Sequence, residues 1–176
     1  MTRIVLIFGL ISGAVSAVLM WIMLAAMKNN TVEHGMLLGY ASMIISLSMV
    51  FFGVKSYRDN NGGRISFFKG MQVGILISLI CSLCYALSWE VYYRSSGSDF
   101  MAQYSAQYIQ KMKEKGASDK EIADTQKQMD DMGEMYKNFF VRFAMTLMEI
   151  VPVGLIVSII SAALLRRREL LPAQPA

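Results

Sequence analysis

Three ionisable side chains inside or beside long apolar segments carry the chemistry that this sequence could perform: Glu90, Arg142 and Glu149. Glu149 lies about 13 Å into the last apolar segment, counted from Phe140 at 1.5 Å per helical residue. A carboxylate at that depth costs roughly 2.5–3.5 kcal/mol, so it needs a partner or a proton. Arg142 lies two helical turns earlier on the same face, and Glu90 lies near the same boundary on the preceding segment. We therefore predict an intramembrane polar cluster of these three residues.

A proline follows Glu149 closely and indicates a second feature of the last segment. Pro152 comes three residues after Glu149, and Gly154 comes two residues after Pro152. A proline inside a helix frees the carbonyl one turn earlier and can kink the helix. We predict a helix kink at Pro152 and Gly154. A carboxyl beside a kink can gate a proton or ion path, or it can be a structural clamp that fixes helix register; the clamp is the interpretation we favour.

Basic residues flank a turn between the second and third apolar segments. Lys55, Arg58, Arg64 and Lys69 surround the polar stretch 59–63. Such residues attract anionic lipid head groups, worth roughly 1 kcal/mol each near the membrane surface, and they are candidate anionic-lipid contacts. They are also the ordinary signature of a cytoplasmic connection, which is the simpler interpretation.

The sequence predicts no catalytic residue, no metal site and no cofactor. Cys81 and Cys84 form a Cys-x-x-Cys pair, but they lie in an apolar segment without the polar setting that activates a thiol, so we expect them to pack as small apolar side chains. His34 is the single histidine, and no nucleophile–base pair is visible. The net charge is +4, and the basic residues lie near the ends of the apolar segments. This placement indicates membrane topology rather than nucleic-acid binding.

Four apolar segments must position these residues. Hydrophobic residues make up 55% of the 176 residues and charged residues only 17%, against about 25% in soluble domains. About 20 apolar residues span the hydrocarbon core as a helix, and backbone groups in lipid must be paired internally. We predict an all-α membrane protein with a four-transmembrane-helix bundle in one domain, with spans at about 4–27, 36–54, 67–93 and 139–165.

Small residues recur every four positions along the predicted spans, as in Gly9 and Gly13, Gly70 and Gly74, and the segment that starts at Gly154. Such rows let helices approach closely where lipid provides no hydrophobic drive. They serve either packing within the bundle, which we favour, or a homo-oligomer.

The segment 94–138 is predicted to form an extracytoplasmic αα-hairpin. A serine- and glycine-rich stretch at 95–98 breaks the third span, and Gly116 fits the C′ position of a first helix. Ser118 and Glu121 have the spacing of a capping box that starts a second helix. The hairpin is either a spacer or a docking surface for a partner. The apolar stripe of the first helix comprises Phe100, Tyr104, Tyr108 and Met112.

The distribution of Lys and Arg predicts orientation. Eight lie in short segments on one side, including Arg3 and the run 166–168, while nine lie on the other side, where seven of them share the segment 94–138 with eight acidic residues. Because dense basic charge in short segments marks the cytoplasmic side, we predict that both termini are cytoplasmic.

Several stretches resemble a bacterial family of four-span membrane proteins, domain of unknown function 4199. They include Phe-Gly-Val-Lys-Ser-Tyr-Arg-Asp at 52–59, Trp-Glu-Val-Tyr-Tyr at 89–93, and Glu-Ile-Val-Pro-Val-Gly-Leu at 149–155. The resemblance covers nearly the whole chain. It implies a multi-pass protein of the bacterial cytoplasmic (inner) membrane with an extracytoplasmic helical segment, and it implies no activity, cofactor or catalytic residue.

Two functional hypotheses follow. The first is a non-enzymatic binding or assembly component that contacts membrane lipids, a membrane protein partner or a second copy of itself. The alternative is a small transporter or channel component in which intramembrane Glu149 couples to a proton or ion, with Glu90 and Arg142 beside it.

Overall fold

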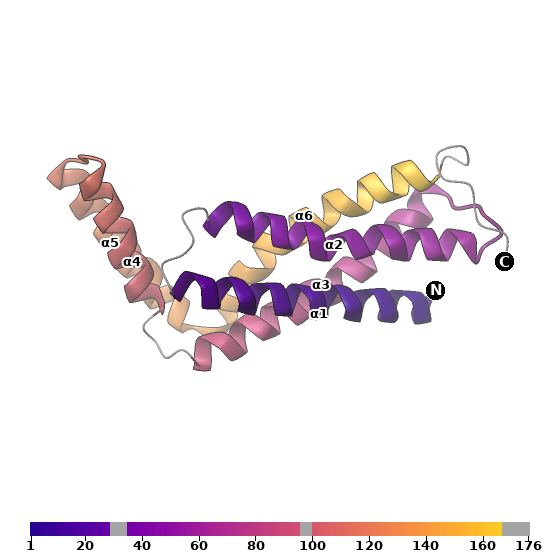
Figure 1. Ribbon diagram of the computed structural model, residues 1–176, viewed down its shortest axis with the longest axis horizontal. Helices are drawn as coiled ribbons and strands as arrows, with labels where there is room; N and C mark the ends of the chain where they lie inside the picture. Colours follow the sequence, from indigo (N-terminus) through magenta and orange to yellow (C-terminus); the bar gives the residue numbers. More distant parts are fainter. Residues whose placement is uncertain (29–34, 96–99, 167–176) are drawn as a thin grey trace. The chain divides into compact units, whose positions relative to one another are not determined.

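The computed structural model describes residues 1–28, 35–95 and 100–166, and this part of the chain is helical with no strand, which confirms the predicted all-α class (Figure 1). Three sets of residues named in the sequence analysis lie outside the described part: His34, residues 96–98 of the serine- and glycine-rich stretch that was predicted to end the third span, and the basic residues 167–168. The helices are α1 (Thr2–Lys28), α2 (Gly35–Asp59), α3 (Phe67–Ser95), α4 (Phe100–Glu114), α5 (Asp119–Lys137) and α6 (Phe139–Leu165).

Four of these helices are long and apolar enough to cross a membrane, as predicted, with a mean hydropathy between 1.9 and 2.4 in their most apolar windows. The second helix continues to Asp59, beyond the apolar run that ends at Val54, so Lys55 and Arg58 lie on α2 itself. The turn that follows contains Gly62 and Gly63, whose φ angles of 69° and 73° suit glycine and end the helix. The candidate spans are Thr2–Ala26, Leu37–Asp59, Phe67–Ser95 and Phe139–Leu165.

The chain divides into two compact units, and α3 and α6 each contribute to both. Unit 1 contains Met1–Ala86 and Leu147–Ala176, and unit 2 contains Leu87–Thr146. Each unit has its own internal contacts.

Unit 1 has an apolar core to which all four spanning helices contribute. Two serines add hydrogen bonds between helices: Ser12 Oγ of α1 donates to the Ser46 carbonyl of α2 over 2.7 Å, and Ser78 Oγ of α3 donates to the Gly154 carbonyl of α6 over 3.2 Å. Both hydroxyls are satisfied inside the unit, as buried polar groups require. The core side chains are Val5, Leu47, Val50, Val54, Val73, Ile77, Cys81, Ile150 and Leu165.

Glycines let the helices of unit 1 approach closely. A Cβ atom on Gly13 would lie 2.6 Å from the Cβ of Cys84, and one on Gly74 would lie 2.9 Å from the Cβ of Ser158. Neither position has room for a side chain. These rows of small residues therefore serve packing within the bundle, and the cysteines take part in that packing.

Unit 2 contains α4 and α5, which lie side by side and are joined by a tight turn (Figure 1). Gly116, with φ 76°, ends α4, and the amide of Ala117 donates to the Met112 carbonyl over 3.1 Å, which is the pattern of a Schellman motif. The predicted capping box starts α5: Ser118 accepts from the Glu121 amide, and the Glu121 carboxylate accepts from the Ser118 amide over 2.9 Å. Local capping thus sets both helix ends at this turn.

Candidate functional site

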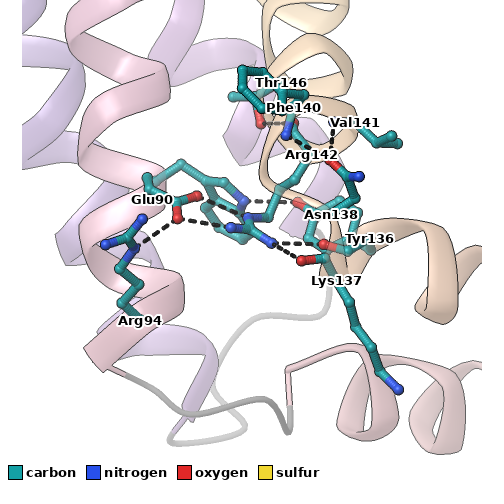
Figure 2. Close-up of polar contacts among 10 residues, drawn as sticks. Glu90, Arg94, Tyr136, Lys137, Asn138, Phe140, Val141, Arg142 and Thr146 are labelled. Atoms are coloured by element: carbon teal, nitrogen blue, oxygen red, sulfur yellow. Dashed lines mark hydrogen bonds and ion pairs between the residues drawn. The ribbon is translucent and has the colours of Figure 1, made fainter.

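Arg142 and Glu90 form a bidentate ion pair inside unit 2 (Figure 2). Arg142, in the first turn of α6, donates from Nε to Glu90 Oε2 over 2.8 Å and from Nη2 to Glu90 Oε1 over 2.7 Å. Arg142 is 4% exposed and Glu90 is 7% exposed. Two parallel charge-assisted hydrogen bonds in a buried setting give this pair a fixed geometry.

The remaining nitrogen of Arg142 reaches the end of α5. Nη1 donates to the Tyr136 carbonyl over 2.7 Å and approaches the Lys137 carbonyl at 3.4 Å (Figure 2). The last carbonyls of a helix have no partner within the helix, so a cation at this point satisfies them. Every nitrogen of the Arg142 guanidinium therefore donates a hydrogen bond, and the side chain joins α3, α5 and α6.

Aromatic rings surround this guanidinium. The Cζ atom of Arg142 lies 4.0 Å from the ring centroid of Tyr93 and 5.9 Å from that of Tyr136. Trp89 Nε1 donates to the Tyr136 hydroxyl over 2.7 Å. The ring faces carry negative charge density and stabilise the cation while they keep it from water.

Glu90 has a second cationic partner on its own helix. Arg94 Nε donates to Glu90 Oε1 over 2.8 Å, and Arg94 lies four residues later on α3 with its side chain largely exposed. Glu90 is therefore shared between one buried and one exposed arginine.

The start of α6, which positions Arg142, is fixed by a local cap. Asn138 Oδ1 accepts hydrogen bonds from the amides of Phe140, at 2.9 Å, and Val141, at 3.4 Å. An asparagine before the first helical residue is a preferred N-cap. In the first turns of α6, Thr146 Oγ1 also donates to the Arg142 carbonyl over 2.9 Å.

The structure brings together two of the three residues of the predicted cluster. Glu149 belongs to unit 1, where its side chain is exposed and has no hydrogen bond or ion pair to any described residue. The nitrogens of Arg142 donate to Glu90 and to the carbonyls at the end of α5, so Glu149 is not among their partners.

Of the two predicted kink residues, Gly154 lies at a contact between α3 and α6, and Pro152 is exposed. The helix is continuous through Pro152, and the Gly154 carbonyl accepts from Ser158 Oγ over 2.7 Å as well as from Ser78 Oγ. Pro152 therefore sits between an exposed carboxyl one turn earlier and a tightly packed glycine that follows it.

The four candidate lipid-contact residues differ in their surroundings. Lys55 Nζ pairs with Asp59 Oδ2 at 2.8 Å, and Arg58 is fully buried. Arg64 and Lys69 line an open pocket of about 460 Å³ at the turn between α2 and α3. The four basic residues therefore have three different environments: one is in an ion pair, one is buried, and two line a pocket.

Sequence reasoning missed several partners that the structure shows. Asp59 and Arg94 could have been found from spacing, because each lies within four residues of its partner on one helix. Tyr93 lies three residues after Glu90 and so shares its face of α3. The carbonyl of Tyr136 gives no such signal, because its role depends on where α5 ends.

Among residues 1–28, 35–95 and 100–166, no group of three or more His, Cys, Asp or Glu side chains could hold a metal ion. In the paired cluster of unit 2, the charged groups are bound to one another. Its geometry is that of a clamp between helices.

The family described as a protein of unknown function (DUF4199) matches residues 7–167 of the chain. Comparisons with curated proteins and with solved structures found no match.

Proposed function

Because the chain belongs to the DUF4199 family of proteins of unknown function and is a multi-pass membrane protein, we propose that it is a non-enzymatic binding or assembly component of a membrane. It binds another membrane molecule through the face of α6 that carries Glu149. The observation that supports this proposal is the exposed carboxyl of Glu149 within a spanning helix.

The face around Glu149 is otherwise apolar. Met148, Ile156 and Ile160 are exposed by 77%, 57% and 52%, and they lie close to Glu149 or at helical spacing from it. Apolar side chains exposed on a spanning helix face lipid, which dissolves them without cost, whereas a carboxylate there costs roughly 2.5–3.5 kcal/mol. A hydrogen-bonding partner in the membrane removes much of that cost.

A partner helix is the occupant that best fits this face. Hydrogen bonds between helices in a bilayer contribute about 1–2 kcal/mol in model peptides. A second copy supplies such a bond directly, because two protonated Glu149 carboxyls can pair with each other. A helix of a different subunit can supply the same bond, and a lipid with a hydrogen-bond donor is the remaining alternative. Gly13 and Gly74 are already committed to packing inside unit 1, so they do not mediate this contact.

Two substitutions test this role. Glu149→Gln keeps a donor and an acceptor, whereas Glu149→Leu removes both. In native mass spectrometry from mild detergent, we expect the wild type to carry a second subunit, a partner or a lipid, the Gln variant to retain most of it, and the Leu variant to lose it. The neighbouring Met148→Leu is the matched control and should behave as wild type. Full retention by the Leu variant contradicts the proposal.

Proton or ion coupling is the second candidate function, supported by the position of Glu149 three residues before Pro152 in a spanning helix. Here Glu149→Gln should abolish pH-coupled uptake into vesicles, because an amide cannot carry the proton. The two candidates separate on this variant: assembly survives the change to Gln, and proton coupling does not. Unchanged flux in the Gln variant excludes the coupling role.

The proposed location is a bacterial cytoplasmic membrane, with both termini in the cytoplasm and α4–α5 on the opposite side. The dense basic charge at the turn between α2 and α3 supports this orientation. Reporter fusions at the C-terminus and at Ala117 test it. A reporter active only in the cytoplasm should work at the C-terminus and fail at Ala117, and the reverse pattern would overturn the orientation.

A further inference from the structure

Arg58 is the largest fully buried side chain in the described part of the chain. It is 1% exposed and continues the buried face of α2, on which Leu47, Val50 and Val54 are each 0% exposed. A buried guanidinium needs hydrogen-bond acceptors for its donors, because none of them can reach water.

The partners of Arg58 leave it incompletely neutralised. Its Nε donates to Asp59 Oδ1 over 2.9 Å, and the other oxygen of Asp59 accepts from Lys55 Nζ over 2.8 Å. One carboxylate thus serves two cations, so these three residues carry a net charge of +1. The group lacks one negative charge for balance.

Both terminal nitrogens of Arg58 are buried without a hydrogen-bond partner. Nη2 comes within 2.8 Å of Asp59 Oδ1, but that oxygen already accepts from Nε, and the approach lacks the alignment of a hydrogen bond. Nη1 has no acceptor. Buried polar groups without partners are rare in proteins and commonly mark the place of an ion, a water or a ligand.

The turn that follows Arg58 also forms a basic pocket. The amides of Asn61 and Gly63 donate to the Arg58 carbonyl over 3.0 and 3.1 Å, so the turn folds back onto the backbone of this residue. The pocket of about 460 Å³ beside the turn contains three cationic side chains and no acidic one. Its lining residues are Asn61, Arg64, Ile65, Ser66, Lys69 and Arg166.

We infer that this end of unit 1 is a phosphate-binding site, in which Arg64, Lys69 and Arg166 line the pocket and the bound phosphate reaches the guanidinium of Arg58, which is not itself a lining residue. The planar guanidinium presents paired N–H groups that match the oxygens of a phosphate, and Lys69 adds a point charge. A phosphate would balance the excess positive charge and occupy donors that otherwise stay empty. The inference is independent of the role proposed for Glu149.

The phosphate belongs either to a phospholipid head group or to free phosphate. Arg58 is the last residue but one of the candidate span Leu37–Asp59, which places it near the depth of the head groups. Anionic lipids are concentrated at that depth and are attracted by clustered Lys and Arg.

The test uses the full chain, stripped of lipid in a maltoside detergent and held at constant ionic strength in chloride. Inorganic phosphate and phosphatidylglycerol are added separately, and the melting temperature and the bound lipid seen by native mass spectrometry are recorded. We expect the melting temperature to rise with at least one of them. A response to phosphatidylglycerol alone identifies a lipid head group, and a response to inorganic phosphate alone identifies a free anion.

Arg58→Met is the decisive variant, because methionine is long and apolar and fills much of the same space. Without phosphate, it should melt at the wild-type temperature or above, because an incompletely paired buried charge has been removed. Its apparent affinity for the responding probe should fall about tenfold or more. Arg3→Gln, at an exposed position on α1, is the matched control and should keep the full response.

Two results would overturn the inference. One is a wild-type protein that shows no rise in melting temperature with either probe and no bound phospholipid, which would mean that water alone satisfies Arg58. The other is an Arg58→Met variant with the full wild-type response. If Arg58→Met does not fold, the double variant Lys69→Gln with Arg166→Gln takes its place and should lose the response, and a full response from it overturns the site.

Discussion

Arg142 and Arg58 are both buried arginines near the ends of spanning helices, and their nitrogens have opposite surroundings. All three nitrogens of Arg142 donate hydrogen bonds, to Glu90 and to the carbonyls that end α5. Arg58 uses only Nε for a hydrogen bond, and its carboxylate partner Asp59 is the next residue on the same helix. Arg142 therefore connects three helices, while the bonds of Arg58 connect none.

This difference separates a structural role from a binding role. A buried charge with every donor occupied adds rigidity and leaves nothing to offer a ligand. A buried charge whose N–H donors lack acceptors lowers the stability of the fold, and a ligand that accepts from those donors restores that stability when it binds. The pairing state of a buried arginine is thus more informative than its burial or its charge.

The largest expected effect comes from breaking the Arg142 clamp. Arg142→Met leaves Glu90 buried, with only the exposed Arg94 as partner, and should lower the free energy of unfolding by about 3–5 kcal/mol. Unfolding in mixed detergent micelles measures this loss. The double variant Glu90→Gln with Arg142→Met should recover part of it, because no uncompensated charge remains. A single variant as stable as wild type would mean that the pair does not clamp the helices.

A smaller effect is expected from the ring that covers the guanidinium. Tyr93→Leu keeps an apolar side chain but removes the ring face 4.0 Å from Arg142, and should cost about 1 kcal/mol in the same unfolding measurement. Tyr93→Phe is the control, since it keeps the ring and should be close to neutral. Equal losses in both variants would assign the effect to the hydroxyl group and not to the cation.

The smallest effect should come from an exposed carboxylate in unit 2. Hydrogen bonds from the backbone and side chain of Ser118 hold the pKa of Glu121 below its usual value of 4.5. A lowered pKa in the folded state means that the contribution to stability is complete above about pH 4.5 and is lost as the pH falls through the lowered value.

We therefore expect the wild type to lose slightly more stability than Glu121→Gln on acidification from about pH 6 to about pH 3. Thermal unfolding followed by circular dichroism measures the difference. A difference in stability as large as that expected for Arg142→Met would contradict this ranking, because an exposed helix cap would then contribute as much stability as a buried ion pair.

The spans and the caps could be predicted from the sequence because their signals are local. Long uncharged runs define the four spans, and the capping box depends on Ser118 and Glu121 alone. The pairing of Arg142 could not be predicted, because Glu90 and Glu149 both lay within plausible reach and only tertiary structure separates them.

The exposure of Glu149 was also beyond prediction. In α6, apolar residues occur on the lipid-facing side as well as the inner side, so the sequence gives little indication of which face is buried. The burial of Arg58 could have been found, since Leu47, Val50 and Val54 lead to it at helical spacing. Its unpaired nitrogens could not, because they depend on atomic positions.

The distance along the chain between Glu90 and Arg142 has a consequence for biosynthesis. They are 52 residues apart, so at about 5–20 residues per second the ribosome completes Arg142 roughly 3–10 s after Glu90. During that interval, the nascent third helix already carries Arg94, four residues from Glu90 and bonded to it in the mature protein. We therefore expect Arg94 to be the counter-ion of Glu90 during this interval, before the last helix is made and Arg142 can pair with Glu90.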